Sequence, residues 1–140
     1  MRIRVVLDTN TAVSALLWRG VAHGLMAEAH RRQYGFWTSG PLLSELRRVL
    51  ERPKFDAVFA KRRTTRQALL ADYESFAHIV WPRHVPEAVG DDPSDNHVLA
   101  CALEAKAKCV ISGDKHLLEM GSYQNILMMR VGQFLREYAG

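Results

Sequence analysis

The stretch IRVVLDTNTAVSALL, residues 3–17, decides the fold class of this chain. Its first part, Ile3–Leu7, is mostly apolar and β-branched, which is typical of a buried strand. Asp8 and Asn10 then interrupt the apolar pattern before a second apolar run over residues 11–17, where Asn10 is placed to cap a helix. The pattern predicts a buried strand that leads directly into a helix, with a carboxylate at the junction.

The same alternation of strand and helix continues along the chain. Further strands are predicted at Gly35–Thr38, Ala77–Trp81, Cys109–Ser112 and Asn125–Met129. Further helices are predicted at about Ala22–Gln33, Pro41–Arg52, Arg66–Phe76 and Pro93–Lys106, with a short one after Asp114 and a last one through Tyr138. Residues 53–66 fit either a helical hairpin or a mobile flap. The alternation predicts an α/β fold, a three-layer α/β/α sandwich with a central parallel sheet, in a single domain over residues 1–140.

The composition is that of an ordinary globular protein with a basic bias. Of the 140 residues, 48% are hydrophobic and 24% are charged, which argues against disorder and fibrous repeats. Lys and Arg number 19 against 15 Asp and Glu, so a polyanionic partner is favoured if the positive charges are grouped. No apolar run approaches the length of a membrane span, and no signal peptide is evident. We therefore expect a soluble, cytoplasmic protein without a membrane partner.

Two acidic residues follow predicted strands. Asp8 comes directly after the strand at residues 3–7, and Asp114 follows the strand at residues 109–112. In open α/β sheets, ligands bind beyond the carboxyl ends of the strands. The two carboxylates are therefore predicted to lie at the same functional edge of the sheet, although either could also cap a helix.

Three more acids occupy early positions in predicted helices. In DDPSDNHVLACALEA, Asp92 fits the N-cap before Pro93, and Asp95 lies one turn further on the same side. Glu45 lies in the second turn of the helix that follows Ser39 and borders its apolar stripe. Each has an ordinary structural explanation: Asp92 as a cap, Asp95 as part of a capping-box-like arrangement, and Glu45 as a solvated helix acid.

Convergence of these acids changes the interpretation. Three or four carboxylates at one edge repel each other and raise one another's pKa unless a cation compensates. The two cysteines, Cys101 and Cys109, fall in predicted core elements, and no His has ligand spacing. An all-oxygen cluster favours Mg²⁺ or Mn²⁺ over zinc. Carboxylate-held ions of this kind suit hydrolysis of phosphate esters.

The sequence resembles the PIN-domain ribonucleases, in particular those that act as toxins of VapC-type toxin–antitoxin pairs. Four segments in order carry the resemblance: VVLDTNTAVSALL, LLSELRRVLERPKF, DDPSDNHVLACALEAKAKCVISGDKHLL and a weaker ILMMRVGQFL. The resemblance implies a metal-dependent endoribonuclease that uses Mg²⁺ or Mn²⁺ to hydrolyse RNA, with an antitoxin protein and a homodimer as expected partners. The residues it implies are the catalytic acids Asp8, Glu45, Asp95 and Asp114, with Asp8, Asp95 and Asp114 holding metal, and Asn10, Asp92 and Ser112 in support.

The chain departs from the family pattern at two places. His116 stands where relatives often carry another acid, and we interpret it as a solvent-facing residue rather than a ligand. Arg130-Val131 replaces a common Thr-Pro before the last helix, so the family pattern does not predict the conformation of this strand–helix junction.

Several basic residues follow Glu45 and could bind RNA phosphates. They are Arg47, Arg48, Arg52, Lys54, Arg62 and Arg63. A solvated basic face without function explains them equally well. Trp18, Trp37 and Trp81 could stack on bases, but each adjoins an apolar run, which favours the core.

Two other functions fit parts of the pattern. A haloacid-dehalogenase-like phosphatase is suggested by VVLDTNT, but that family has a second Asp where this chain has Asn10. The second Asp expected four residues after Asp114 is also missing, because residue 118 is Leu. A nucleic-acid-binding module without catalysis is the second alternative. A binder of polyanions gains nothing from an acidic cluster, so the nuclease is the favoured hypothesis.

Overall fold

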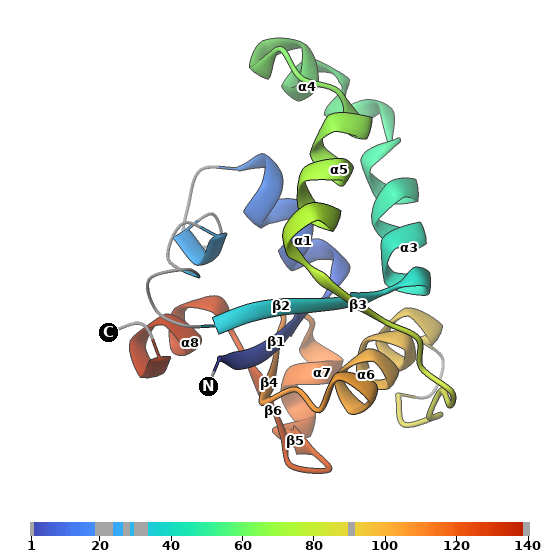
Figure 1. The fold of residues 1–140 in the computed structure, drawn as a ribbon, viewed down its shortest axis with the longest axis vertical. Helices are drawn as coiled ribbons and strands as arrows, with labels where there is room; N and C mark the ends of the chain where they lie inside the picture. Colours follow the sequence, from blue (N-terminus) through green and yellow to red (C-terminus); the bar gives the residue numbers. More distant parts are fainter. Residues whose placement is uncertain (1, 19–23, 27–28, 30–33, 90–91, 139–140) are drawn as a thin grey trace.

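A computed structural model of the chain describes residues 2–18, 24–26, 29, 34–89 and 92–138. Within these ranges the strands form one six-stranded sheet in the order β3-β2-β1-β4-β6-β5 (Figure 1). The strands are β1 (Ile3–Leu7), β2 (Tyr34–Ser39), β3 (His78–Val80), β4 (Cys109–Ile111), β5 (Ser122–Tyr123) and β6 (Ile126–Met129). All neighbouring pairs are parallel except β5 with β6. The predicted central parallel sheet is confirmed, with an antiparallel strand added at one edge.

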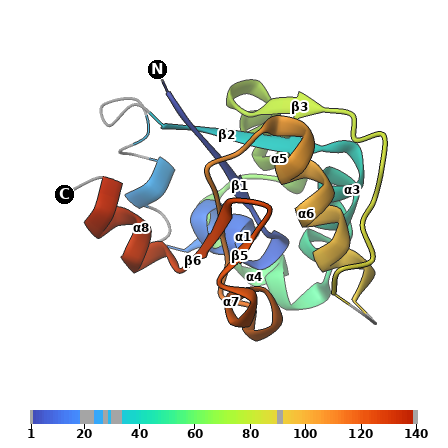
Figure 2. The ribbon, with the colours of Figure 1, turned by 90° about the horizontal axis from the view of Figure 1, so that it is seen from below.

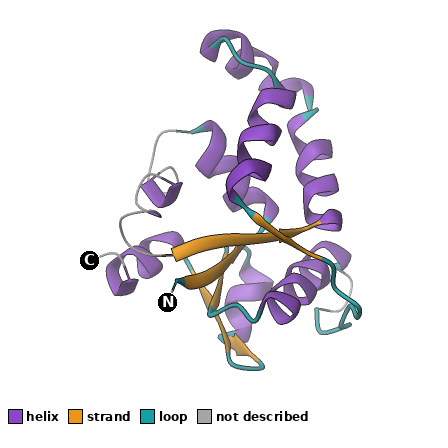
Figure 3. Cartoon of the chain, in the orientation of Figure 1, coloured by secondary structure: helices purple, strands orange, loops and turns teal. Residues whose placement is uncertain are grey.

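Helices connect the strands, as the alternating sequence pattern predicts (Figure 3). They are α1 (Thr9–Leu17), α3 (Gly40–Leu50), the 3₁₀ helix η1 (Pro53–Phe55), α4 (Asp56–Arg62), α5 (Arg66–Phe76), α6 (Pro93–Ala105), α7 (Lys115–Met120) and α8 (Val131–Tyr138). Most of the helix predicted at 22–33 lies outside the described residues, but residues 24–26 and 29 are helical. No helix within the described ranges combines the length and apolar character needed to cross a membrane.

Alternating side chains of the strands divide the core into two layers. In β1, Val5 and Leu7 pack into a cluster with residues of α1, α5 and α8. Val6 points to the other face and packs with residues of α6 and α7. Figure 1 shows α1 and α5 above the sheet and α6 and α7 below it, and Figure 2 shows α8 and α6 on either side of β1. Because successive side chains of a strand point to opposite faces of the sheet, β1 contributes apolar side chains to the core on both faces. The sheet with helices on both faces forms the three-layer α/β/α sandwich.

The order of the strands reverses between β1 and β4. From β1 the chain reaches β2 on one side, and it later returns to place β4 on the other side, with both strands parallel to β1. Connections that diverge in this way leave a crevice beyond the carboxyl ends of the two strands. Asp8 directly follows β1 and Ser112 directly follows β4, so both enter that crevice.

Polar residues at the helix N-termini agree with the sequence prediction except at α1. Ser39 caps α3 and Asp92 caps α6 by accepting backbone N–H groups of the first turn. The prediction that Asn10 caps the first helix is wrong: Asp8 is the N-cap of α1, and Asn10 is already the second helical residue. The reason is that the Asp8 side chain accepts the N–H of Thr11, so the helix begins two residues earlier than the apolar run.

Residues 53–66 form the helical hairpin that the sequence left open. The 3₁₀ helix leads directly into α4, whose C-cap Arg63 has a φ of 53° and reverses the chain toward α5. Arg66 joins the hairpin to α3, because its guanidinium donates to the carbonyl of Leu50 and to the carboxylate of Asp56. The segment is therefore anchored to the helical layer rather than left as a free flap.

Two other features differ from the sequence prediction. The β5–β6 hairpin turns at Gln124 and Asn125, with φ of 48° and 71°; Gln is unusual in such a turn, so the sequence did not signal it. Trp81 is 74% exposed and Trp18 is 47% exposed, so the prediction that they belong to the core is wrong. Trp81 follows the edge strand β3, and among the described residues no further strand lies beyond β3 to cover it.

Candidate metal-binding active site

Asp8 is fixed at the mouth of the crevice by two hydrogen bonds. The carboxylate is 6% exposed. Its Oδ1 accepts the backbone N–H of Thr11 at 2.8 Å, and its Oδ2 accepts the hydroxyl of Ser112. The strand end of β1 and the strand end of β4 are thereby joined through a single carboxylate.

Ser112 extends this connection to Asp114. The Ser112 hydroxyl is buried and accepts the backbone N–H of Asp114 at 2.8 Å while it donates to Asp8. Asp114 in turn caps the short helix α7, because its Oδ1 accepts the N–H of His116 at 2.7 Å. Ser112 therefore sets the separation and orientation of the two strand-end carboxylates.

Asp95 brings a buried carboxylate from the first turn of α6. It is 5% exposed, and its Oδ2 has no hydrogen-bond partner among the described residues. Burial, followed by the negative charges of Asp114 and Asp92, raises the pKa of Asp95 to about 7. The Asp92 side chain caps the same helix and accepts the N–H of Asp95 at 3.3 Å. A buried, unpaired carboxylate beside two other acids is stable in its ionised form only if a cation joins it.

Glu45 reaches the site from α3 and is held by two hydroxyls. Its Oε2 accepts the hydroxyl of Thr9 at 2.8 Å, and its Oε1 accepts the hydroxyl of Ser94 at 2.8 Å. Neither hydroxyl residue was predicted from the sequence. Their positions carried a usable signal, since Thr9 follows Asp8 directly and Ser94 shares the first turn of α6 with Asp95. Glu45 thus connects α3 to α1 and α6 at the crevice.

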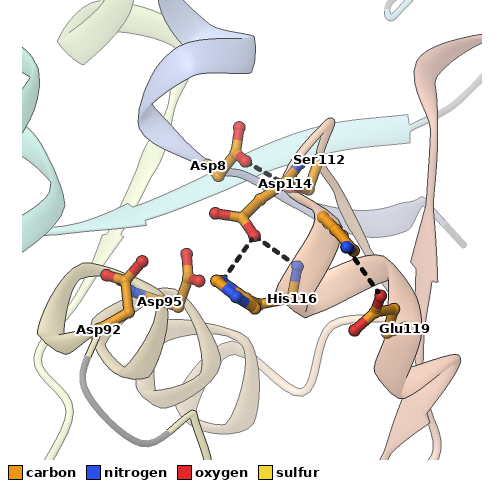
Figure 4. Close-up of polar contacts among 8 residues, drawn as sticks. Asp8, Asp92, Asp95, Ser112, Asp114, His116 and Glu119 are labelled. Carbon is orange, nitrogen blue, oxygen red and sulfur yellow. Dashed lines mark hydrogen bonds and ion pairs between the residues drawn. The ribbon is translucent and has the colours of Figure 1, made fainter.

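These side chains surround a cavity of about 140 Å³. Its lining residues are Asp8, Thr9, Asn10, Glu45, Asp92, Ser94, Asp95, Val98 and Asp114. At its edge, the possible ligand atoms of four residues lie within 4.8 Å of one another: Asp92, Asp95 and Asp114, which line the cavity, and His116, which does not. Asp8 and Glu45 line the cavity but are not members of this group. Figure 4 shows Asp8 and Asp114 on one side of this group and Asp92 and Asp95 on the other. The donor set is mostly carboxylate oxygen, and the unpaired Oδ2 of Asp95 gives it a buried anionic centre, so it fits a divalent cation such as Mg²⁺ or Mn²⁺.

The electrostatics of Asp8 lead to the same conclusion. Burial raises the pKa of Asp8, the negative charge of Asp114 adds to the rise, and the hydrogen bonds from Ser112 and Thr11 oppose it. The two donors thus favour the ionised form at a position where burial disfavours it. A bound cation would stabilise the ionised form of Asp8 against the remaining effect of burial and of the Asp114 charge.

Each predicted site residue except the basic set faces the cavity or supports a residue that does. Asn10 is exposed on α1 and lines the cavity, and Ser112 hydrogen-bonds to both Asp8 and Asp114. The His116 side chain is 67% exposed, as expected, but its ring nitrogen lies 3.7 Å from Asp114 Oδ1 and belongs to the closest group of possible ligands. Sequence spacing from Asp114 could not reveal this, because it depends on how α7 begins.

The six predicted RNA-binding residues lie along α3 and the helical hairpin. All are exposed, but α4 lies at the end of the hairpin that is remote from the sheet (Figure 1). The Arg62 guanidinium is engaged elsewhere, because it donates to the carbonyls of Leu16 at 3.1 Å and Leu17 at 2.5 Å. Lys54 lies over the ring of Phe55. Arg62 therefore attaches the hairpin to the end of α1, and Lys54 packs on a ring within the hairpin. Arg47 and Arg48, in contrast, lie in the same helix as Glu45.

The chain is similar to known proteins of one family. A sequence profile of the PIN domain matches residues 4–116, which include all the acids described above. Among solved structures, the PIN domain of T. brucei RRP44 is similar, with 16% sequence identity and a TM-score of 0.47; the match covers 98% of this chain and 81% of that one. No curated protein sequence is significantly similar to this chain.

Proposed function

The chain belongs to the PIN domain family, and from this premise we propose that it is a metal-dependent endoribonuclease that hydrolyses RNA with Mg²⁺ or Mn²⁺. The observation that carries the proposal is the buried, unpaired Oδ2 of Asp95 beside Asp114 and Asp92. A site that only bound RNA would repel phosphates with such a cluster, whereas a site that binds cations requires it.

The carboxylates have distinct roles in this proposal. Asp95 and Asp114 hold the metal, with the His116 imidazole and Asp92 within reach of it. Asp8, joined to Asp114 through Ser112, is the third ligand in this proposal. When bound, the ion supplies an activated water and neutralises charge on the phosphate in the transition state. Ser112 fixes the position of Asp8 relative to Asp114. Glu45 is oriented by Thr9 and Ser94 to accept a proton from a water in the cavity. Asn10, on the exposed rim of the cavity, is placed to orient a substrate oxygen.

The proposal is tested by cleavage of mixed cellular RNA by the purified protein, with Mn²⁺, with Mg²⁺ and with EDTA. We expect cleavage that requires either cation and that falls at least 100-fold in Asp8→Asn, since that variant loses a metal-binding charge but keeps an oxygen for Thr11. Asp72→Asn, an identical change on the exposed face of α5, is the matched control and should cleave normally. Equal activity of Asp8→Asn and the wild type would contradict the proposal.

Two further measurements on the same protein, RNA binding in EDTA and detection of a phosphorylated Asp8, separate the alternatives. RNA binding that persists in EDTA and is unchanged in Asp95→Asn, without any cleavage, would favour a binding module. Formation of an aspartyl-phosphate at Asp8 would favour a phosphatase of the haloacid-dehalogenase type.

We further propose that the protein is a toxin of the VapC type, neutralised by an antitoxin, cytoplasmic, and active as a homodimer. The resemblance of the motif segments supports this. Expression of the wild type should arrest growth, Asp8→Asn should not, and sedimentation of the purified chain should give twice the mass of one chain, 15.9 kDa. Harmless expression of an RNase-active protein would contradict the toxin assignment alone.

A further inference from the structure

A second and larger cavity adjoins the acidic one. It has a volume of about 400 Å³, and its lining residues are Asn10, Thr11, Ser14, Ser112, Gly113, Arg130, Val131 and Gly132. Asn10 lines both cavities, and Ser112, which lines the second, donates to Asp8 in the first. The two cavities are therefore neighbours along the carboxyl edge of the sheet.

The walls of this second cavity are chemically unlike those of the acidic one. No carboxylate lines it, and the side chain of Val131 offers an apolar surface. On α1, the hydroxyl of Ser14 has no hydrogen-bond partner within the described part of the chain, whereas the Thr11 side chain hydrogen-bonds to Asp8. At Gly113 the space that a Cβ would occupy is open. A free hydroxyl beside an apolar wall suits a flat heterocycle with polar edges, and the volume falls in the range of sites for small organic ligands.

Arg130 supplies the only positive charge among the residues lining this cavity. It is exposed at the junction between β6 and α8, where the family pattern has an uncharged residue. Within the described ranges its guanidinium forms no ion pair and no hydrogen bond. A planar guanidinium with free donors matches the oxygens of a phosphate.

We propose that the cavity between α1 and the β6–α8 junction binds the nucleotide adjacent to the scissile phosphate of single-stranded RNA, with Arg130 on its phosphate. The inference rests on the proposed nuclease function. The acidic cavity tolerates a phosphate only where a cation is bound. The next phosphate along the RNA must therefore lie outside the acidic cavity, away from the carboxylates. Arg130 is the cation on the far side of Asn10, and the nucleoside occupies the volume between them.

Two variants separate the charge from the space. Arg130→Ala should raise KM for a short fluorescent single-stranded RNA about 5- to 10-fold with kcat within about twofold, and make the salt dependence of binding shallower by about 0.7 in log–log slope. Ser14→Leu should raise KM by filling the cavity, without changing that slope. Arg130→Lys keeps the charge and should restore the slope, even if KM stays above the wild-type value.

Arg83→Ala is the matched control, because it removes one exposed arginine charge from the loop before α6 and keeps the backbone N–H that Glu104 accepts. It should change neither KM nor the slope. The inference is overturned if Arg130→Ala and Ser14→Leu behave as the wild type, or if Arg83→Ala reproduces the effect of Arg130→Ala. If the wild type itself neither cleaves nor binds RNA, the nuclease proposal is refuted, and this inference with it.

Discussion

Replacement of Asp95 by Asn should stabilise the metal-free protein at neutral and alkaline pH. Asp95 is buried, and its Oδ2 has no partner among the described residues, while Asp92 and Asp114 carry charges of the same sign nearby. Asn has nearly the same shape but no charge, and its amide can donate to a neighbouring carboxylate. The substitution therefore removes electrostatic repulsion and the penalty for burying a charge, without creating a hole in the core.

The size of the effect follows from the pKa. Burial and the charges of Asp114 and Asp92 raise the pKa of Asp95 to about 7 in the folded protein, whereas an Asp in the unfolded chain titrates near about 3.9. The folded state binds the proton more tightly, so stability falls as the pH rises from about 4 to about 7 and is constant above. About 1.4 kcal/mol per pH unit gives an upper limit of about 4 kcal/mol, which contact of the site with water reduces to about 1–2 kcal/mol.

Thermal unfolding in EDTA measures this effect. At pH 8 the melting temperature of Asp95→Asn should exceed that of the wild type by about 3–6 °C, and at pH 4.5 the two should nearly coincide. Saturating Mn²⁺ should reverse the order, because ion at 100 times its Kd adds about 2.7 kcal/mol to the wild type alone. Asp72→Asn should follow the wild type throughout. A difference between Asp95→Asn and the wild type that is the same at pH 4.5 and pH 8 would refute the electrostatic explanation.

Three further substitutions test other contacts. Ser112→Ala should weaken Mn²⁺ binding about 10- to 100-fold in calorimetry with an unchanged circular dichroism spectrum, because it frees Asp8 and Asp114 from their shared support; unchanged affinity would contradict this. Tyr34→Phe should lower the free energy of unfolding by about 1–2 kcal/mol in urea titrations, since it removes the hydroxyl that donates to the carbonyl of buried Leu25 at 2.6 Å. Lys106→Gly should raise that free energy by about 0.5–1 kcal/mol, because φ at this helix end is 54°; a lower urea midpoint would argue against strain there.

Much of the architecture was predictable because it depends on local patterns. An apolar strand followed by a polar junction and a helix occurs at Asp8 and again at Asp114, and parallel strands bring such junctions to one edge. Pro93 after Asp92 marked the start of α6, and this fixed the position of Asp95. Local signals of this kind need no knowledge of tertiary contacts.

What escaped prediction depends on contacts between distant segments. Thr9 and Ser94 meet at Glu45 only after α1, α3 and α6 have packed together. Arg62 resembles an RNA-binding residue in the sequence, yet it reaches back to carbonyls at the end of α1, 45 positions away in the case of Leu17. The exposure of Trp81 depends on β3 being the edge of the sheet, which the order of strands decides and the composition of the segment does not.

The sequence posed cap and metal ligand as alternatives for Asp8, but the structure makes them compatible. Each carboxylate oxygen has two lone pairs, so an oxygen that accepts one N–H or O–H can still coordinate an ion. The donors on Asp8, from Thr11 and Ser112, lower its pKa against the effect of burial, and they fix its orientation before any ion arrives. Asp92 and Asp114 also cap helices, so the positive ends of α1, α6 and α7 face the same crevice. Capping is therefore the means by which this fold holds several carboxylates at one place, and Asp95, which caps nothing, is the acid that most needs the metal.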